Sequence, residues 1–126
     1  YQGCTIETIA MWRELGAVMA CDAMALLGGG VMTEFARAML GAGLVDILAS
    51  DNHGDRRTMA TAVVWMSEFG AESQAQLLTT DNPARLLTGE ELQPVPPVSF
   101  QRGVFDRLRE LIFGSSRRPA VNGAEQ

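Results

Sequence analysis

Histidine and cysteine are scarce in this chain of 126 residues, and lysine is absent. His53 is the only histidine, so the chain by itself cannot build a metal site that needs several imidazole ligands. All ten basic residues are arginines, and with 15 acidic residues they give a net charge of −5, which argues against nucleic acid as the main partner. Two cysteines, Cys4 and Cys21, are too few for a disulfide scaffold.

The sequence also lacks a signal peptide, a long apolar run and an initiating methionine. Without an apolar run long enough to span a membrane, and without a signal peptide, a cytoplasmic protein is favoured. The chain opens on Tyr1, Gln2 and Gly3, so we expect a segment to be missing upstream. The length leaves room for one domain, and a hydrophobic content of 47% suits a globular core.

The most informative part of the sequence is residues 44–53, where an apolar run is followed by Ser50, Asp51, Asn52 and His53. A short run rich in branched aliphatic residues is typical of a parallel strand buried on both faces. In α/β folds the chemistry lies at the carboxyl ends of such strands. Residues i and i+2 of an extended segment point the same way, so Asp51 and His53 can converge on one point.

Helical periodicity alternates with short apolar runs elsewhere in the chain. We expect helices at residues 5–15, 31–40, 58–69, 71–79 and 84–87, and strands at 17–21 and 44–49. Residues 23–30 are expected to form a loop, with a short turn of helix as an alternative. The helix between the strands predicts a parallel βαβ unit, with Asp22 after the first strand as Asp51 follows the second. Asp81 or Asn82 is the expected cap of the last helix. Because two strands alone do not make a stable parallel sheet, the pattern predicts the carboxyl-terminal part of a larger α/β fold.

Beyond a first domain at residues 1–92, the composition changes. Residues 93–99 are rich in proline and predict a stiff linker. Residues 100–114 carry apolar residues at helical spacing and predict an amphipathic helix, and residues 115–126 predict a disordered tail. The polar face of that helix carries arginines, which raises contact with a membrane surface as an alternative, but its acidic residues dilute the charge.

The residues around and after the second strand form a series of motifs. The matching residues are Ile47-Leu48-Ala49-Ser50-Asp51-Asn52-His53, Arg56-Arg57, Glu68-Phe69-Gly70-Ala71-Glu72 and Asn82-Pro83-Ala84-Arg85-Leu86-Leu87-Thr88-Gly89. This order of a strand, Ser-Asp-x-His, arginine, a helix and Asn-Pro-x-x-Leu-Leu-x-Gly resembles the end of the polymerase and histidinol phosphatase (PHP) superfamily. Within it, the chain most resembles the manganese-dependent protein-tyrosine phosphatases of bacterial capsule and exopolysaccharide operons.

The resemblance implies an α/β fold that is the carboxyl-terminal portion of a distorted PHP-type (β/α)7 barrel. It implies that Asp51 and His53 are ligands of manganese or other divalent metal ions, and that Arg56 or Arg57 clamps the phosphoryl oxygens. The implied reaction is hydrolysis of phosphotyrosine by a metal-activated hydroxide, on a protein such as a bacterial tyrosine kinase of polysaccharide assembly. The family's further histidine ligands are not in this chain, so we expect the isolated chain to be inactive.

Several alternatives stay open from the residues alone. His53 could be a solvated loop residue, Asp22 could be a site residue or a helix cap, and Arg56 and Arg57 could be a solvated pair at a helix start. The chain could also be a non-catalytic binding or regulatory module derived from the same fold. A third possibility is a PHP phosphoesterase that acts on a small-molecule phosphate.

Overall fold

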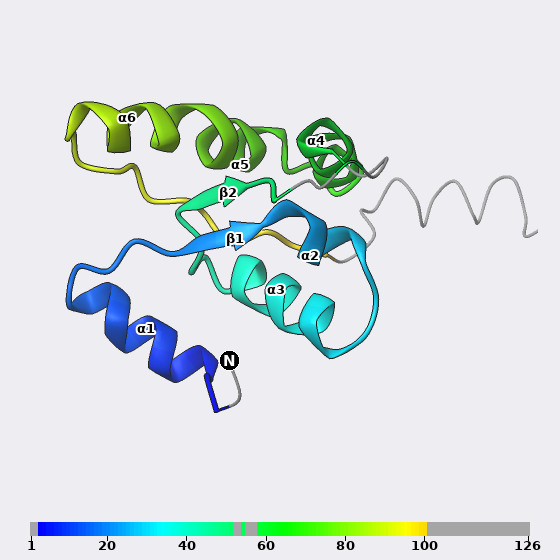
Figure 1. Cartoon of the computed structure of the whole chain (residues 1–126), viewed down its shortest axis with the longest axis horizontal. Coiled ribbons are helices and arrows are strands. Elements are labelled where there is room, and N and C mark those ends of the chain that lie inside the picture. The colour runs from blue at the N-terminus through cyan, green and yellow to red at the C-terminus, as the bar shows by residue number, and fades with distance from the viewer. Residues whose placement is uncertain (1–2, 52–53, 55–57, 101–126) are drawn as a thin grey trace, which may run out of the picture.

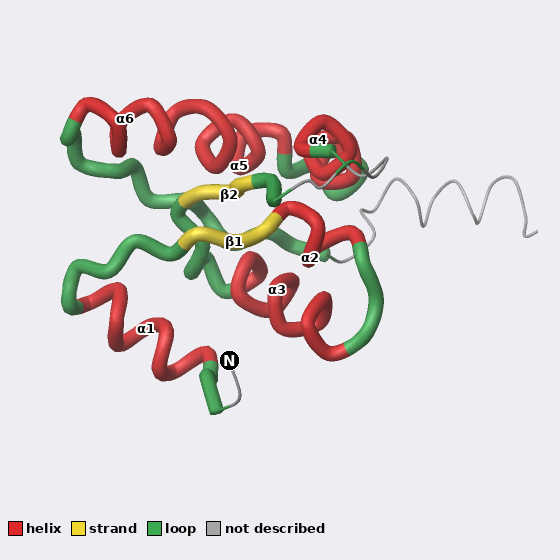
Figure 2. Tube along the Cα trace, in the orientation of Figure 1, coloured by secondary structure: helices red, strands yellow, loops and turns green. Residues whose placement is uncertain are grey.

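The computed structural model describes residues 3–51, 54 and 58–100, and in them helices surround a small parallel sheet (Figure 1). The elements in chain order are α1 (Ile6–Glu14), β1 (Ala20–Asp22), α2 (Ala23–Leu27), α3 (Val31–Gly41), β2 (Ile47–Ala49), α4 (Met59–Ser67), α5 (Glu72–Gln76), the π-helical η1 (Leu77–Asp81) and α6 (Asn82–Thr88). Figure 2 shows the two strands side by side at the centre, with helices on either side of them. The chain is therefore a mixed α/β protein, as the sequence predicts.

The parallel βαβ unit is confirmed. β1 and β2 pair in parallel with Ala20 opposite Ile47 and Asp22 opposite Ala49, and α3 lies on the connection between them. Both strands are shorter than the predicted runs. The N–H of Met19 donates to the Asp46 carboxylate at 2.8 Å and not to a backbone carbonyl. Regular pairing of the strands therefore begins after Met19, at Ala20.

The sheet has one buried and one exposed face in the described part of the chain. Cys21 and Leu48 are opposite each other, 8% and 4% exposed, and they belong to the hydrophobic core. Ala20, Asp22 and Ala49 point to the other face and are exposed. The expectation of burial on both faces is therefore wrong for these residues, and the alternation of the pleat accounts for the pattern.

Local sequence signals set most helix ends. The hydroxyl of Thr5 caps α1 by accepting the N–H of Thr8 at 3.2 Å, and Thr58 caps α4 in a reciprocal bond with Thr61. Gly89 ends α6 in the left-handed region at φ +72°, where a residue with a Cβ would be strained. The sequence therefore encodes these boundaries locally, and the predicted helices at these positions are confirmed.

The prediction that Asp81 or Asn82 caps the last helix is wrong. α5, η1 and α6 follow one another without a break, and neither Asp81 nor Asn82 makes a capping hydrogen bond from its side chain. Asn82 is instead fully buried, and its side-chain amide bonds to backbone groups of Asp46 and Gln93. Asparagine before proline is a helix-start signal, but here long-range partners outcompete the local cap.

Residues 93–99, the expected linker, form neither helix nor strand, and they pack against the domain. Val95 and Val98 are 5% and 3% exposed, and the Val98 N–H donates to the Leu40 carbonyl at 3.2 Å. Phe100 stacks on Trp65 with ring centroids 5.5 Å apart. Burial of these valines is energetically favourable, and the segment therefore helps to cover the core.

The expected amphipathic helix after Phe100 and the expected tail at residues 115–126 lie outside the described residues. Among the helices that the structure does describe, none is long and apolar enough to cross a membrane.

Asn82 yields a stability test. Replacing Asn82 with aspartate keeps its shape but turns the amide that faces two carbonyls into a carboxylate, so we expect a loss of about 3 kcal/mol in the free energy of unfolding. Asp81→Asn is the matched control, since among the described residues the Asp81 side chain bonds to the exposed Gln76, and it should change stability by less than about 0.5 kcal/mol. Urea denaturation followed by circular dichroism measures both. Equal effects of the two substitutions would contradict the structural role of Asn82.

Candidate functional site

Two carboxylates lie at the carboxyl ends of the two strands. Asp22 is the last residue of β1, and Asp51 follows the end of β2 by two residues. Because Asp22 is opposite Ala49 in a parallel pair, both chain segments leave the sheet at the same edge. Both side chains are exposed. The structure thus brings two of the predicted site residues to one edge of the sheet.

Asp22 has a local role in the structure. Its carboxylate accepts the N–H of Met24 at 2.9 Å and so caps α2, which begins immediately after β1. Of the two alternatives from the sequence, the helix cap is observed. A carboxylate has more acceptor positions than one N–H uses, so the cap is compatible with a second, solvent-facing contact.

The other predicted site residues cannot be placed. His53, Arg56 and Arg57 lie outside the described residues. Within residues 3–51, 54 and 58–100, no three His, Cys, Asp or Glu side chains are grouped so as to hold a metal ion. Asp51 is therefore the one predicted metal ligand with a position in the structure.

Cys21, next to Asp22, is suited to the core and not to nucleophilic chemistry. Burial raises the pKa of the Cys21 thiol from 9.0 to about 11, and the negative charge of Asp22 adds to the shift. The thiol is therefore protonated near neutral pH, and a protonated thiol is a weak nucleophile.

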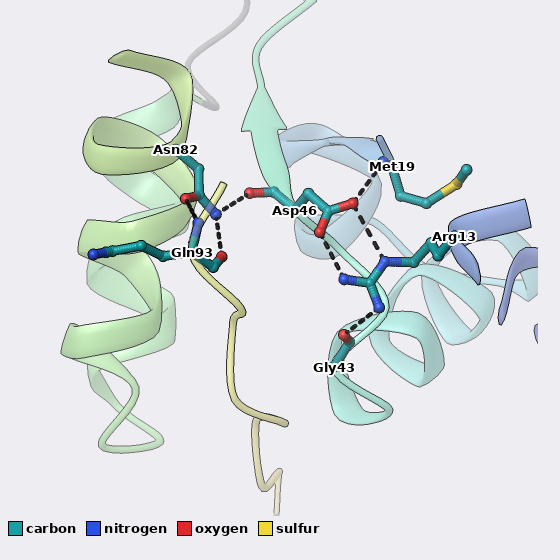
Figure 3. A network of polar contacts seen from close by, with 6 residues as sticks. All are labelled: Arg13, Met19, Gly43, Asp46, Asn82 and Gln93. Atoms are coloured by element: carbon teal, nitrogen blue, oxygen red, sulfur yellow. Dashed lines mark hydrogen bonds and ion pairs between the residues drawn. The ribbon is translucent and has the colours of Figure 1, made fainter. Parts of the chain in front are cut away.

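At the opposite, amino-terminal edge of the sheet, the structure shows a polar network that the sequence did not predict (Figure 3). Asp46 is 6% exposed, and its two carboxylate oxygens accept from Arg13 at 2.7 and 3.3 Å. One of them also accepts the Met19 N–H. Arg13 donates a further bond to the Gly43 carbonyl at 3.2 Å. The buried charge is thus paired and fully hydrogen-bonded, as burial requires.

Asn82 extends this network to the last helix (Figure 3). Its side-chain amide donates to the carbonyls of Asp46 at 3.0 Å and Gln93 at 2.9 Å, while its oxygen accepts the Gln93 N–H at 2.8 Å. A charged residue inside an apolar run was the available signal for Asp46, because a buried carboxylate needs a partner. Its partner Arg13 is 33 positions away, so spacing alone could not identify it.

An open pocket of about 650 Å³ lies beside the network. It is bordered by the Arg13–Asp46 pair, by Val18 and Leu44, and by Glu91 and Pro94 of the segment after α6. It is therefore at the amino-terminal edge of the strands, away from Asp22 and Asp51. The Arg13–Asp46 pair that borders the pocket is held within the hydrogen-bond network described above.

Comparison of the chain with protein-family models, curated proteins and solved structures finds no match. The family resemblance is therefore carried by the motifs of the chain alone, and the activity that it implies is treated as a proposal below.

The environment of Cys21 predicts the reactivity of the two thiols. At pH 8 a pKa of about 11 leaves roughly one thousandth of Cys21 ionised, about a hundredfold less than for an unshifted thiol. We expect the partly buried Cys4 to react first with Ellman's reagent, and Cys21 to react at least about a hundredfold more slowly until urea unfolds the chain. The variants Cys4→Ser and Cys21→Ser assign the two phases. A fast phase that survives in Cys4→Ser would contradict the buried, protonated thiol.

Proposed function

We propose that the chain is the carboxyl-terminal part of a metal-dependent phosphatase of the PHP type, located in the cytoplasm. The observation that carries the proposal is the position of Asp51, which is exposed and lies two residues beyond β2 at the carboxyl edge of a parallel sheet. Asp51 belongs to the Ser-Asp-x-His motif of the resemblance, and this edge is where α/β folds hold their catalytic groups.

A second support comes from the Asn-Pro-x-x-Leu-Leu-x-Gly segment. Its first residue, Asn82, is fully buried and fixes α6 to the residue before β2, and its last residue, Gly89, ends α6 at positive φ. The motif therefore holds a helix against the strand that carries Asp51. Such a supporting role explains why the two motifs occur together at this spacing.

The exposed sheet face supports a larger parent fold. In a closed parallel barrel, alternate side chains of each strand point into a filled interior. Here Ala20 and Ala49 point to the exposed face, and small residues of this kind suit a shared interior. We therefore treat β1 and β2 as two strands of a distorted PHP-type barrel whose other strands belong to a longer protein.

The donors of this chain fit part of a metal site. The Asp51 carboxylate is a ligand type that manganese accepts, and His53, two positions later, supplies an imidazole. Two donors do not hold a catalytic metal, so the remaining ligands come from the rest of the larger fold. Bound manganese would supply Lewis-acid activation of water and of the phosphoryl group. Arg56 or Arg57 would orient the phosphoryl oxygens, because a guanidinium matches their geometry.

The proposed substrate is phosphotyrosine on a protein that controls exopolysaccharide or capsule synthesis, such as a bacterial tyrosine kinase. This choice rests on the likeness to one branch of the superfamily. A PHP phosphoesterase for a small-molecule phosphate is the neighbouring alternative, and a substrate panel on the longer protein separates the two. A non-catalytic regulatory module is favoured by one observation, the single histidine of this chain.

The proposal predicts a difference between the chain and its longer parent. We expect no manganese-dependent hydrolysis of para-nitrophenyl phosphate by the pure chain, because most metal ligands are elsewhere. In the longer protein, Asp51→Asn and His53→Ala should each lower kcat at least about a hundredfold.

Asp81→Asn is the matched control in that assay, because Asp81 lies at the start of α6 and outside the carboxyl edge. It should retain the rate of the unmodified protein. Manganese-dependent turnover by the pure chain, abolished by His53→Ala, would contradict the incomplete site. Full activity of the longer protein with Asp51→Asn would exclude the proposed ligand.

A further inference from the structure

We propose that the outward face of α4 is a docking surface, and that its occupant is an amphipathic helix of this same chain, residues 101–113. That segment lies outside the described residues, and its helical character is expected from its sequence. The inference requires neither the metal nor the phosphatase activity.

α4 has one side in the core and an opposite side that is uncovered. Ala62 and Met66 are fully buried, whereas Val64 between them is 61% exposed. With 3.6 residues per turn, Val64 points directly away from the side of Ala62 and Met66. Ala60 and Glu68 lie four positions before and after Val64, on the same side, and are exposed as well. The side of Ala60, Val64 and Glu68 is the outward face of α4.

The larger fold proposed above leaves this face free. Added strands would pair with the edges of the sheet, and their side chains would fill the barrel interior, while helices form the outer ring. Met66 of α4 packs in one core cluster with Cys21 and Leu48, on the buried face of the sheet. The outward face of α4 therefore points away from the sheet and from the interior, and the missing strands do not account for its exposure.

The composition of α4 favours a covered outward face. Its nine residues, Met59–Ser67, include no charged residue. A helix with one side in solvent carries charged and polar residues on that side, whereas a helix that is apolar all round is buried. Ala60 and Val64 thus stand where a solvent-facing helix has charged residues.

The described part of the chain ends beside this helix. Phe100 stacks on Trp65 with ring centroids 5.5 Å apart and meets Phe69 edge-on at 5.3 Å. All three rings are half-buried, and Trp65 is next to Val64 in the sequence. Residue 101 therefore starts at the last turn of α4. A helix of residues 101–113 is about 20 Å long and α4 is about 14 Å long, so this segment can cover the outward face.

The sequence of the segment matches such a surface. Its apolar residues recur at helical spacing and form one stripe: Val104, Phe105, Leu108, Leu111 and Ile112. With 3.6 residues per turn, Arg107 and Arg109 lie on the two borders of this stripe, whereas Asp106 and Glu110 lie on the far side. The docked helix thus turns apolar residues and arginines toward α4 and carboxylates toward solvent.

Charge and tethering favour this occupant over a second copy of the chain. Residues 101–126 hold five of the ten arginines but only three of the 15 acidic residues, so the segment is basic and the rest of the chain is acidic. Glu68 on the outward face is exposed, and no described residue forms an ion pair with it. A second copy would bring a second acidic body, which like-charge repulsion opposes. A segment tethered by a short connection has an effective concentration of about millimolar, which a separate partner rarely reaches.

The test uses trypsin cleavage after Arg107 in the 126-residue chain, because a bound helix resists proteolysis. A synthetic peptide of residues 101–126 gives the rate for the free segment. Mass spectrometry should show cleavage after Arg107 at least about tenfold slower in the chain than in the peptide. Cleavage after Arg117, which lies beyond the helix, should be equally fast in both.

The variants locate the docking surface. Val64→Asp places a charge on the outward face and should raise cleavage after Arg107 to the rate of the peptide. Leu87→Asp is the matched control, since Leu87 is a large apolar residue on α6 that is 89% exposed, and it should leave the protection unchanged. Ile112→Asp changes the apolar stripe and no described residue, so it should also abolish the protection without unfolding the domain. Circular dichroism checks that each variant is folded.

Three results would overturn the inference. Cleavage after Arg107 at the peptide rate in the unmodified chain would leave the segment free for another surface, such as a membrane. Protection that persists in folded Val64→Asp would place the segment elsewhere on the domain. Protection that is lost on dilution of a chain that sediments as a dimer would assign the face to a second copy. The assay contains no manganese and no phosphate ester, so none of these results bears on the phosphatase proposal.

Discussion

The fold depends on one buried carboxylate. Asp46 accepts two bonds from Arg13 of α1 and one from the backbone of Met19 before β1, and its own carbonyl accepts the amide of Asn82 from α6. A single residue thus connects the first helix, both strands and the last helix. Removing one partner from a buried ion pair costs about 3–5 kcal/mol, which is a large part of the stability of a domain of this size.

This network lies at the amino-terminal ends of the two strands, and Asp22 and Asp51 lie at or beyond their carboxyl ends. At the amino-terminal edge, charged groups are buried and satisfy each other, so they fix the strands and are not available for chemistry. At the carboxyl edge, Asp22 and Asp51 are exposed and lie at or just beyond the strand ends. A buried, paired carboxylate and two exposed carboxylates therefore lie at opposite ends of the same two strands.

The sequence was sufficient where local chemistry decides the structure. Helical periodicity and the apolar runs predicted the helices and the parallel crossover. The structure shows that local signals, namely the threonine caps and the terminal glycine of α6, set the ends of these helices. The sequence did not predict the features that depend on contacts between residues far apart in the chain. Asn82 has the sequence context of a cap but bonds to Asp46, 36 positions away, and the proline-rich segment packs through Val95 and Val98. At the candidate site, the placement of Asp51 at a strand end was predictable, whereas the capping role of Asp22 needed the structure.

The different roles of the two strand ends are tested most directly by thermal unfolding of the longer protein with and without millimolar manganese. Binding to the folded state raises the midpoint of unfolding. We expect Asp46→Asn to lower the midpoint by several degrees and to retain the rise with manganese, because Asp46 is structural. Asp51→Asn should lose the rise with manganese, because it removes a ligand of the proposed site. A rise that persists in Asp51→Asn, or disappears only in Asp46→Asn, would contradict the assignment of the metal to the carboxyl edge.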